Sequence, residues 1–98
     1  MRLVWSEHAK NALKETADYI LREYGHSVKN QFLHDVYHTT LLIGRNPKMG
    51  KIEKFKVDGK VQYRSIVVNK LNKIVYVIGA GSIEIIAFWD TRREPQME

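Results

Sequence analysis

Two stretches in the first half of the chain place apolar residues at intervals of three and four, the spacing that gives a helix one apolar face. The first stretch follows Ser6, which can cap a helix by accepting a hydrogen bond from first-turn amides, and it ends at Gly25. This pattern predicts a helix of about five turns that packs on a core through one side. The apolar stripe consists of Ala9, Ala12, Leu13, Thr16, Ala17, Ile20 and Tyr24.

The second stretch follows Ser27, which is expected to cap it, and it ends near Gly44 and Asn46-Pro47. A proline biases the residue before it away from helical dihedral angles, so the helix should stop there. Only two or three residues separate the two helices, which predicts an antiparallel helical hairpin. The second stripe consists of Val28, Phe32, Val36, Thr39 and Ile43, widened by Leu33, Tyr37 and Leu42.

The remaining segments have strand-like patterns separated by turn residues. Asp58-Gly59 suits a tight hairpin turn, and residues 69–72 and 79–81 mark two further reversals. A short apolar run at residues 3–5 predicts one more strand before the first helix. The chain is therefore predicted to be α+β, with four consecutive antiparallel strands after two helices. These four strands are expected at residues 52–57, 61–69, 73–78 and 83–89.

The last two predicted strands are too continuously apolar for a sheet with one wet face. A helical hairpin can cover only one face, so we expect the C-terminal tail or a partner segment to lie on the other. The alternative is that a small twisted sheet leaves some aromatic side chains half exposed.

The length of 98 residues fits one domain spanning residues 1–98. The absence of cysteine excludes disulfides and thiolate-metal sites, and it is compatible with a reducing compartment. No apolar run approaches the roughly 20 residues of a membrane-spanning helix, and the apolar start is too short for a signal peptide. We therefore expect a cytoplasmic protein without a membrane segment.

The net charge of +5 is unevenly distributed. Between residues 45 and 73, nine basic residues stand against only Glu53 and Asp58. Such a band attracts a nucleic acid or an acidic protein partner, although it can also be a solvated face that keeps the protein soluble. The basic residues are Arg45, Lys48, Lys51, Lys54, Lys56, Lys60, Arg64, Lys70 and Lys73.

Candidate chemistry lies where the predicted sheet could gather arginines from distant positions. Arginine binds phosphate through a fork of donors, and several such groups can stabilise the charge that develops during phosphodiester cleavage. A carboxylate with a raised pKa could act as the base toward a ribose hydroxyl. The catalytic candidates are Arg64, Arg92, Arg93, Glu53 and Asp90, and the RNA-binding candidates are Lys51, Lys54 and Lys56.

Each of these arginines also has a structural interpretation. Arg64 could pair with a carboxylate, and Arg92 or Arg93 could pair with Glu94 or Asp90. No histidine, the usual proton carrier at neutral pH, lies in this region.

His34 and His38 lie one helical turn apart, but a solvated helix face explains them as well as a metal site does. We expect neither a metal nor a cofactor.

At this point the chain resembles the toxins of the RelE/ParE superfamily, the toxin half of type II toxin-antitoxin modules. The resemblance covers nearly the whole length, and its motifs are individually weak but occur in the matching order. They are Val4-Trp5-Ser6 with Ala9, Asn46-Pro47 with Gly50, Tyr63-Arg64, Val75-Tyr76, residues 85–88, Arg92-Arg93 and Pro95.

The resemblance implies a short N-terminal strand and a two-helix hairpin packed on a mainly antiparallel sheet of four to five strands. It also implies a cognate antitoxin that wraps the toxin in a hetero-oligomer. RelE-like members cut messenger RNA on the ribosome, whereas ParE-like members poison DNA gyrase without a known catalytic constellation. Arg64 matches the strand arginine of RelE-like members, but Asp90 stands where many relatives carry a histidine or a tyrosine.

The leading hypothesis from the sequence is a ribosome-dependent mRNA endonuclease in which Arg64 contacts the scissile phosphate. Arg92 or Arg93 would assist, with Glu53 or Asp90 as the base. The first alternative is a non-catalytic toxin that inhibits gyrase through protein contacts. The second alternative is an inactive relative that is retained as an antitoxin-binding or DNA-autoregulation partner.

Overall fold

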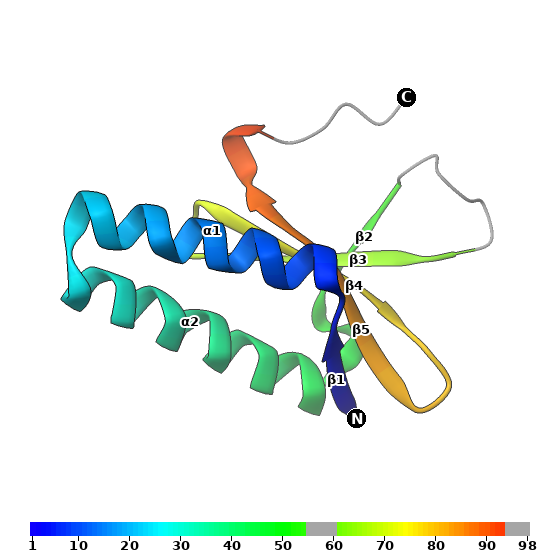
Figure 1. Cartoon of the computed structure of the whole chain (residues 1–98). Helices are drawn as coiled ribbons and strands as arrows, with labels where there is room; N and C mark the ends of the chain where they lie inside the picture. Colours follow the sequence, from blue (N-terminus) through cyan, green and yellow to red (C-terminus); the bar gives the residue numbers. More distant parts are fainter. Residues whose placement is uncertain (55–60, 94–98) are drawn as a thin grey trace.

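The computed structural model describes residues 1–54 and 61–93, and of Arg93 only the backbone. Two helices lie on one side of a five-stranded sheet (Figure 1), which confirms the α+β prediction. The elements are β1 (Arg2–Trp5), α1 (Glu7–Tyr24), α2 (His26–Arg45), the 3-10 helix η1 (Pro47–Met49), β2 (Lys51–Glu53), β3 (Tyr63–Val68), β4 (Asn72–Ile78), β5 (Ser82–Asp90) and the 3-10 helix η2 (Thr91–Arg93).

The strands lie in the order β1-β5-β4-β3-β2. β2, β3, β4 and β5 pair antiparallel in sequence order, as predicted, while β1 pairs in parallel with the last strand. The predicted strand limits were approximate, because β3 covers Tyr63–Val68 rather than residues 61–69 and β2 includes only Lys51–Glu53 of the described residues. The predicted Asp58-Gly59 turn falls outside the described residues.

The two helices begin and end largely where the apolar pattern indicated. The Ser6 hydroxyl accepts a hydrogen bond from the Ala9 amide at 3.0 Å, so the predicted first cap is confirmed. The second cap was wrong, because α2 starts at His26 and Gly25, not Ser27, precedes it. Gly25 has a φ of 90°, a conformation that glycine adopts readily, so this one residue makes the reversal expected to need two or three.

The helix hairpin packs on the sheet through a single core that joins both layers. Phe88 of β5 lies between Phe32 of α2 and Trp5 of β1, with ring centroids 6.0 Å and 6.4 Å away. The fully enclosed side chains come mostly from the two central strands, so β4 and β5 anchor the domain. The buried core consists of Ala9, Ala17, Phe32, Val36, Ile43, Val68, Ile74, Tyr76, Ile83, Ile85 and Phe88.

Side chains alternate between the two faces of the sheet, and this alternation positions every candidate site residue. On β3, Ile66 and Val68 pack toward the helices, so Ser65 and Val67 point to the opposite face. Val75 pairs with Ser65 across the ladder and is fully buried, whereas Val67 is half exposed. The central strand β4 is therefore covered on both faces, as its apolar sequence predicted, whereas β5 is not covered throughout, because Glu84 is exposed. The C-terminal tail that was expected to cover the second face, residues 94–98, lies outside the described residues. No helix in the described part of the chain is long and apolar enough to cross a membrane.

Tyr76 fixes the connection from α2 to β2. Its hydroxyl donates to the Pro47 carbonyl at 2.6 Å and accepts from the Gly50 amide at 3.0 Å, and its side chain is fully buried. A Cβ on Gly50 would lie 2.5 Å from this hydroxyl and 3.0 Å from the Ser65 carbonyl oxygen. The connection can therefore pass over Tyr76 only with a glycine at this point.

Gly50→Ala is consequently expected to destabilise the fold by about 1–3 kcal/mol, the usual range for forcing an extra methyl into a packed site. Urea unfolding followed by circular dichroism measures this change. Gly81→Ala is the matched control, because a Cβ there meets nothing within 4 Å. Equal stability of the two variants would contradict the close contact at Tyr76.

Candidate functional site

Arg64 lies on the helix-facing side of β3, aligned with Ile52 on β2 and Tyr76 on β4. Its Nη1 donates to the carbonyl oxygens of Gly50 at 2.9 Å and Lys48 at 3.1 Å. The guanidinium therefore holds the turn between η1 and β2. No carboxylate pairs with it within residues 1–54 and 61–93, so the carbonyls take the place of the expected carboxylate partner.

Glu53 points to the opposite face of the sheet. Its Oε2 accepts a hydrogen bond from the Ser65 hydroxyl at 2.5 Å and one from the Lys73 ammonium at 3.0 Å. The side chains of Lys73 and Glu53 are only 9% and 11% exposed, so this is a buried ion pair. We call Glu53, Ser65 and Lys73 the sheet-face triad.

The surroundings of Glu53 in the triad make it poorly suited to act as a general base. Burial raises the pKa of Glu53, but the hydrogen bonds from Ser65 and Lys73, together with the charges of Lys73 and Lys51, lower it by more and leave it below its ordinary value. A carboxylate with a lowered pKa holds a proton less readily, which is the reverse of what base catalysis requires.

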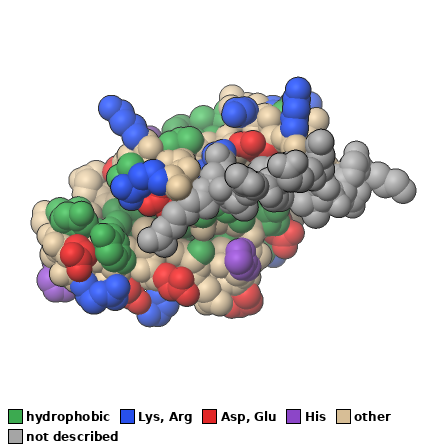
Figure 2. Space-filling view, turned by 90° about the horizontal axis from the view of Figure 1, so that it is seen from above, with side chains coloured by type: hydrophobic (Ala, Val, Ile, Leu, Met, Phe, Trp, Pro, Cys, Tyr) green, Lys and Arg blue, Asp and Glu red, His purple; other side chains and the backbone are tan. Residues whose placement is uncertain are grey.

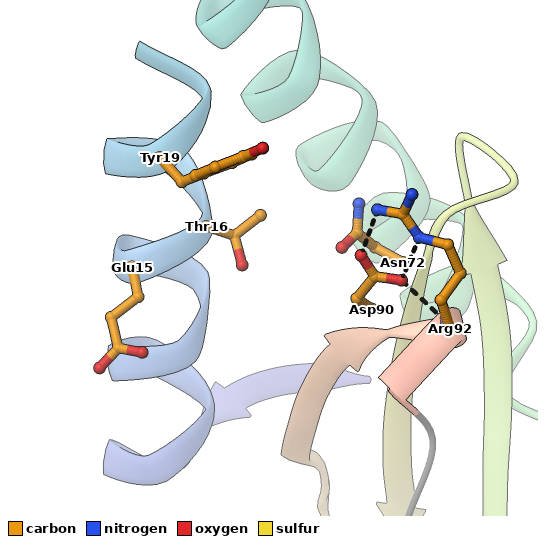
Figure 3. A pocket seen from close by; sticks show the side chains of 6 residues that line it. All are labelled: Glu15, Thr16, Tyr19, Asn72, Asp90 and Arg92. Carbon is orange, nitrogen blue, oxygen red and sulfur yellow. Dashed lines mark hydrogen bonds and ion pairs between the residues drawn. The ribbon is translucent and has the colours of Figure 1, made fainter. Parts of the chain in front are cut away.

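Asp90 and Arg92 form a third group at the far end of β5, beside a polar cavity of about 310 Å³ (Figure 3). Arg92 donates to Asp90 through Nε at 3.0 Å, Nη2 at 2.6 Å and its backbone amide at 2.8 Å. The hydrogen bond with Asp90 also raises the pKa of Arg92. This bears out the structural interpretation of the pair, since each group has the other as a partner. The cavity is lined by Glu15, Thr16, Tyr19, Asn72, Asp90 and Arg92.

These groups do not share one site. Asp90 is aligned with Asn72 on β4, four residues before Tyr76, the partner of Arg64. At the usual rise per strand residue this is roughly 13 Å, with β4 also lying between the two residues. The expected gathering of the last-strand arginine with Arg64 is therefore not found for Arg92.

The remaining candidates are either exposed or outside the description. The Lys51 and Lys54 side chains are exposed at the β2 edge of the sheet. Lys56 and the side chain of Arg93 lie outside the described residues. Figure 2 shows lysine and arginine side chains in several separate places on this view of the molecule rather than in one patch.

Sequence reasoning missed two members of the triad, Ser65 and Lys73. Lys73 was counted only within the basic band, yet its side chain is buried between Val67 and Trp89 of the neighbouring strands. A lysine at the start of a continuously apolar strand was the available signal, because such a position is buried on both faces. His34 and His38 are exposed and stack with centroids 6.5 Å apart, and the described residues contain no group of three metal-ligating side chains.

Comparison with known proteins identifies the family. Residues 3–95 match the family described as ParE toxin of type II toxin-antitoxin system, parDE. The chain belongs to the ParE toxin family. It is therefore a toxin of the RelE/ParE superfamily, and type II toxins pair with a cognate antitoxin. No curated protein matches the sequence significantly.

Solved structures share this fold at low sequence identity. The chromosomal ParDE toxin-antitoxin system from P. aeruginosa matches with a TM-score of 0.74 and 15% identity, covering 92% of this ParE-family chain and 95% of the other. The YoeB/ParE toxin from Agrobacterium tumefaciens has a TM-score of 0.57 and 20% identity, with coverages of 92% and 98%. The YoeB dimer from Staphylococcus aureus has a TM-score of 0.57 and 21% identity, with coverages of 89% and 92%.

Proposed function

We propose that this ParE-family toxin acts in the cytoplasm as a non-catalytic inhibitor of DNA gyrase and is neutralised by its cognate antitoxin in a hetero-oligomer. The observation that carries the proposal is the separation of Arg64 from Glu53, which project from opposite faces of the sheet. The family match adds independent support, because ParE-like toxins poison gyrase.

A ribonuclease site needs cationic donors and a base around one phosphate. Arg64 is held by backbone carbonyls, and Glu53 is held by Ser65 and Lys73. Asp90 is held by Arg92 at the other end of the strands. Each described candidate is thus engaged where it lies: Arg64 and Glu53 project from opposite faces of the sheet, and Asp90 lies at the other end of the strands.

The ribosome-dependent endonuclease remains the second candidate for a specific reason. Lys51 and Lys54 are exposed at one edge of the sheet, where they could follow an RNA backbone, and two of the structural neighbours carry the YoeB name. In that case the donors of Arg64 other than Nη1, which bonds the carbonyls of Lys48 and Gly50, would have to reach the phosphate.

Two assays on the purified protein separate these activities. One measures supercoiling by gyrase, and the other maps new 5′ ends on messages in a cell-free translation reaction. We expect Arg64→Ala to retain gyrase inhibition within about threefold of the wild type when activity is normalised to the folded fraction. Loss of a transition-state donor would instead lower cleavage by about 100-fold or more.

The results of the two assays on the wild-type protein decide between the two activities. Cuts that appear only on translated message, together with unaffected supercoiling, would overturn the gyrase proposal and restore the endonuclease. A chain without either effect would be the inactive relative.

A further inference from the structure

The polar cavity at the end of β5 contains an amide side chain whose hydrogen-bonding groups the fold does not use. Asn72, the first residue of β4, is only 7% exposed, yet its carboxamide makes no hydrogen bond with any residue among 1–54 and 61–93. Buried polar groups are nearly always paired, because an unpaired one costs free energy. The Asn72 side chain lines the cavity of about 310 Å³ (Figure 3). Solvent or a ligand in the cavity must therefore supply the missing partner.

The sheet side of this cavity is fixed by the fold. Asn72 is aligned with Asp90 across the β4–β5 ladder. The Thr91 amide donates to the Leu71 carbonyl at 2.7 Å, which ties the start of β4 to the residues that follow β5. The backbone that carries Asn72 is therefore held in place before any ligand binds, which lowers the entropic cost of binding.

The charges around the cavity favour a neutral ligand. Asp90 and Arg92 form an ion pair at 2.6 Å, so their charges compensate each other. Glu15 is exposed on α1 and points away from the sheet residues in Figure 3. A phosphate would meet the Asp90 carboxylate, and a cation would meet the Arg92 guanidinium, so each is disfavoured by a like charge. A neutral group with both donors and acceptors meets no such repulsion.

The α1 side of the cavity offers an aromatic surface. Tyr19 is 50% exposed, and Figure 3 shows its side chain reaching from α1 toward the sheet residues. Tyr24 contacts the Tyr19 ring at an interplanar angle of 77°, with centroids 6.4 Å apart, so it cannot cover both faces of that ring. A flat ligand can therefore stack on Tyr19 while its edge meets Asn72. Nucleobases have this combination, because they are planar and carry donors beside acceptors on their edges.

We propose that this cavity binds an unpaired adenine base. The Asn72 carboxamide pairs with the edge on which the 6-amino group stands beside a ring nitrogen, and this pairing uses both the donor and the acceptor of the amide. The cavity volume is at the lower limit for ligand pockets, which suits a base with its sugar rather than a peptide. The base can belong to a free nucleoside or to a single-stranded nucleic acid. The proposal goes beyond gyrase inhibition and does not depend on it.

Adenosine is the first probe, and the side-chain amide signals of Asn72 in nitrogen-edited NMR spectra are the readout. These signals should shift as adenosine is added. Purine riboside, which lacks the 6-amino group, should bind at least about tenfold more weakly, because it leaves the amide oxygen unpaired. Unchanged Asn72 signals up to the solubility limit of adenosine, or equal binding of both nucleosides, would overturn the proposal. The cavity would then hold only water.

Asn72→Leu distinguishes ligand binding from a structural role of the amide. It should weaken adenosine binding at least about tenfold without lowering stability in urea, because it replaces an unpaired buried amide with an apolar side chain of similar size. A marked loss of stability would mean that the fold itself needs the amide, and it would contradict the proposal.

Tyr19→Leu tests the stacking surface and should weaken adenosine binding about tenfold. Tyr37→Leu is the matched control, because Tyr37 is exposed on α2 and does not line the cavity. Equal effects of the two changes would exclude stacking on Tyr19. A short oligodeoxyadenylate then identifies the source of the base. Binding at least about tenfold tighter than adenosine would indicate a single-stranded nucleic acid, and equal or weaker binding would indicate a free nucleoside.

Discussion

Lys73→Met is expected to lower the free energy of unfolding by about 3–5 kcal/mol, the range for removing one partner of a buried ion pair. Met matches the length of the lysine stem but leaves the Glu53 carboxylate at 11% exposure without its ammonium partner. Among the described residues, the Ser65 hydroxyl would still donate a hydrogen bond to Glu53 Oε2. Urea unfolding at pH 7 measures the loss, which approaches the whole stability of many small domains.

The double variant Glu53→Gln/Lys73→Met distinguishes the effect of the unpaired Glu53 carboxylate on stability from the effect of lost side-chain packing. It should recover a large part of the deficit, because a neutral amide is far less unfavourable in a buried position than an unpaired carboxylate. A Lys73→Met protein within about 1 kcal/mol of the wild type, or a double variant less stable than the single one, would contradict the buried-pair account.

The pH dependence follows from the direction of the pKa shift. The pKa of Glu53 is lowered in the folded protein, so the ionised group adds stability above its unfolded pKa. That contribution disappears as the pH falls through the lower, folded pKa. In Lys73→Met the ammonium no longer lowers the pKa of Glu53, so Glu53 should become protonated at a higher pH than in the wild type. The difference in free energy of unfolding between the two proteins should therefore become smaller as the pH falls.

Most of the fold could be read from the sequence, because helix and strand patterns are local. Apolar intervals of three and four located both helices, and the turn residues separated β3, β4 and β5 correctly. The error at Ser27 arose because a serine is a good cap in general, whereas Gly25 can reverse the chain alone with a positive φ. The sequence gives residue types, but not which of two adjacent caps the chain will use.

The candidate site was less predictable, since it depends on the face to which each strand residue points. Tyr63, Arg64 and Ser65 do not alternate clearly between polar and apolar, so the sequence does not reveal that Arg64 faces the helices. The pairing of Lys51 with Ser65 then puts Glu53 on the other face, within reach of Lys73. A shift of one residue in this register would have exchanged the faces of Glu53 and its neighbours. The sequence therefore identifies the candidate residues, but it does not show that they point to different faces of the sheet.

Phe88→Ala is expected to be as damaging as the loss of Lys73, at about 3–5 kcal/mol, because it removes a buried aromatic ring and leaves a cavity. Phe88 is 3% exposed and contacts Phe32 on α2 and Trp5 on β1. It therefore connects the helical layer to the sheet. The change is measured by thermal or urea unfolding, with Val67→Ala as the control on the opposite, half-exposed position of the sheet. A Phe88→Ala protein whose free energy of unfolding is within about 1 kcal/mol of the wild type would mean that other residues hold the two layers together, because removing a buried ring of this size normally costs more.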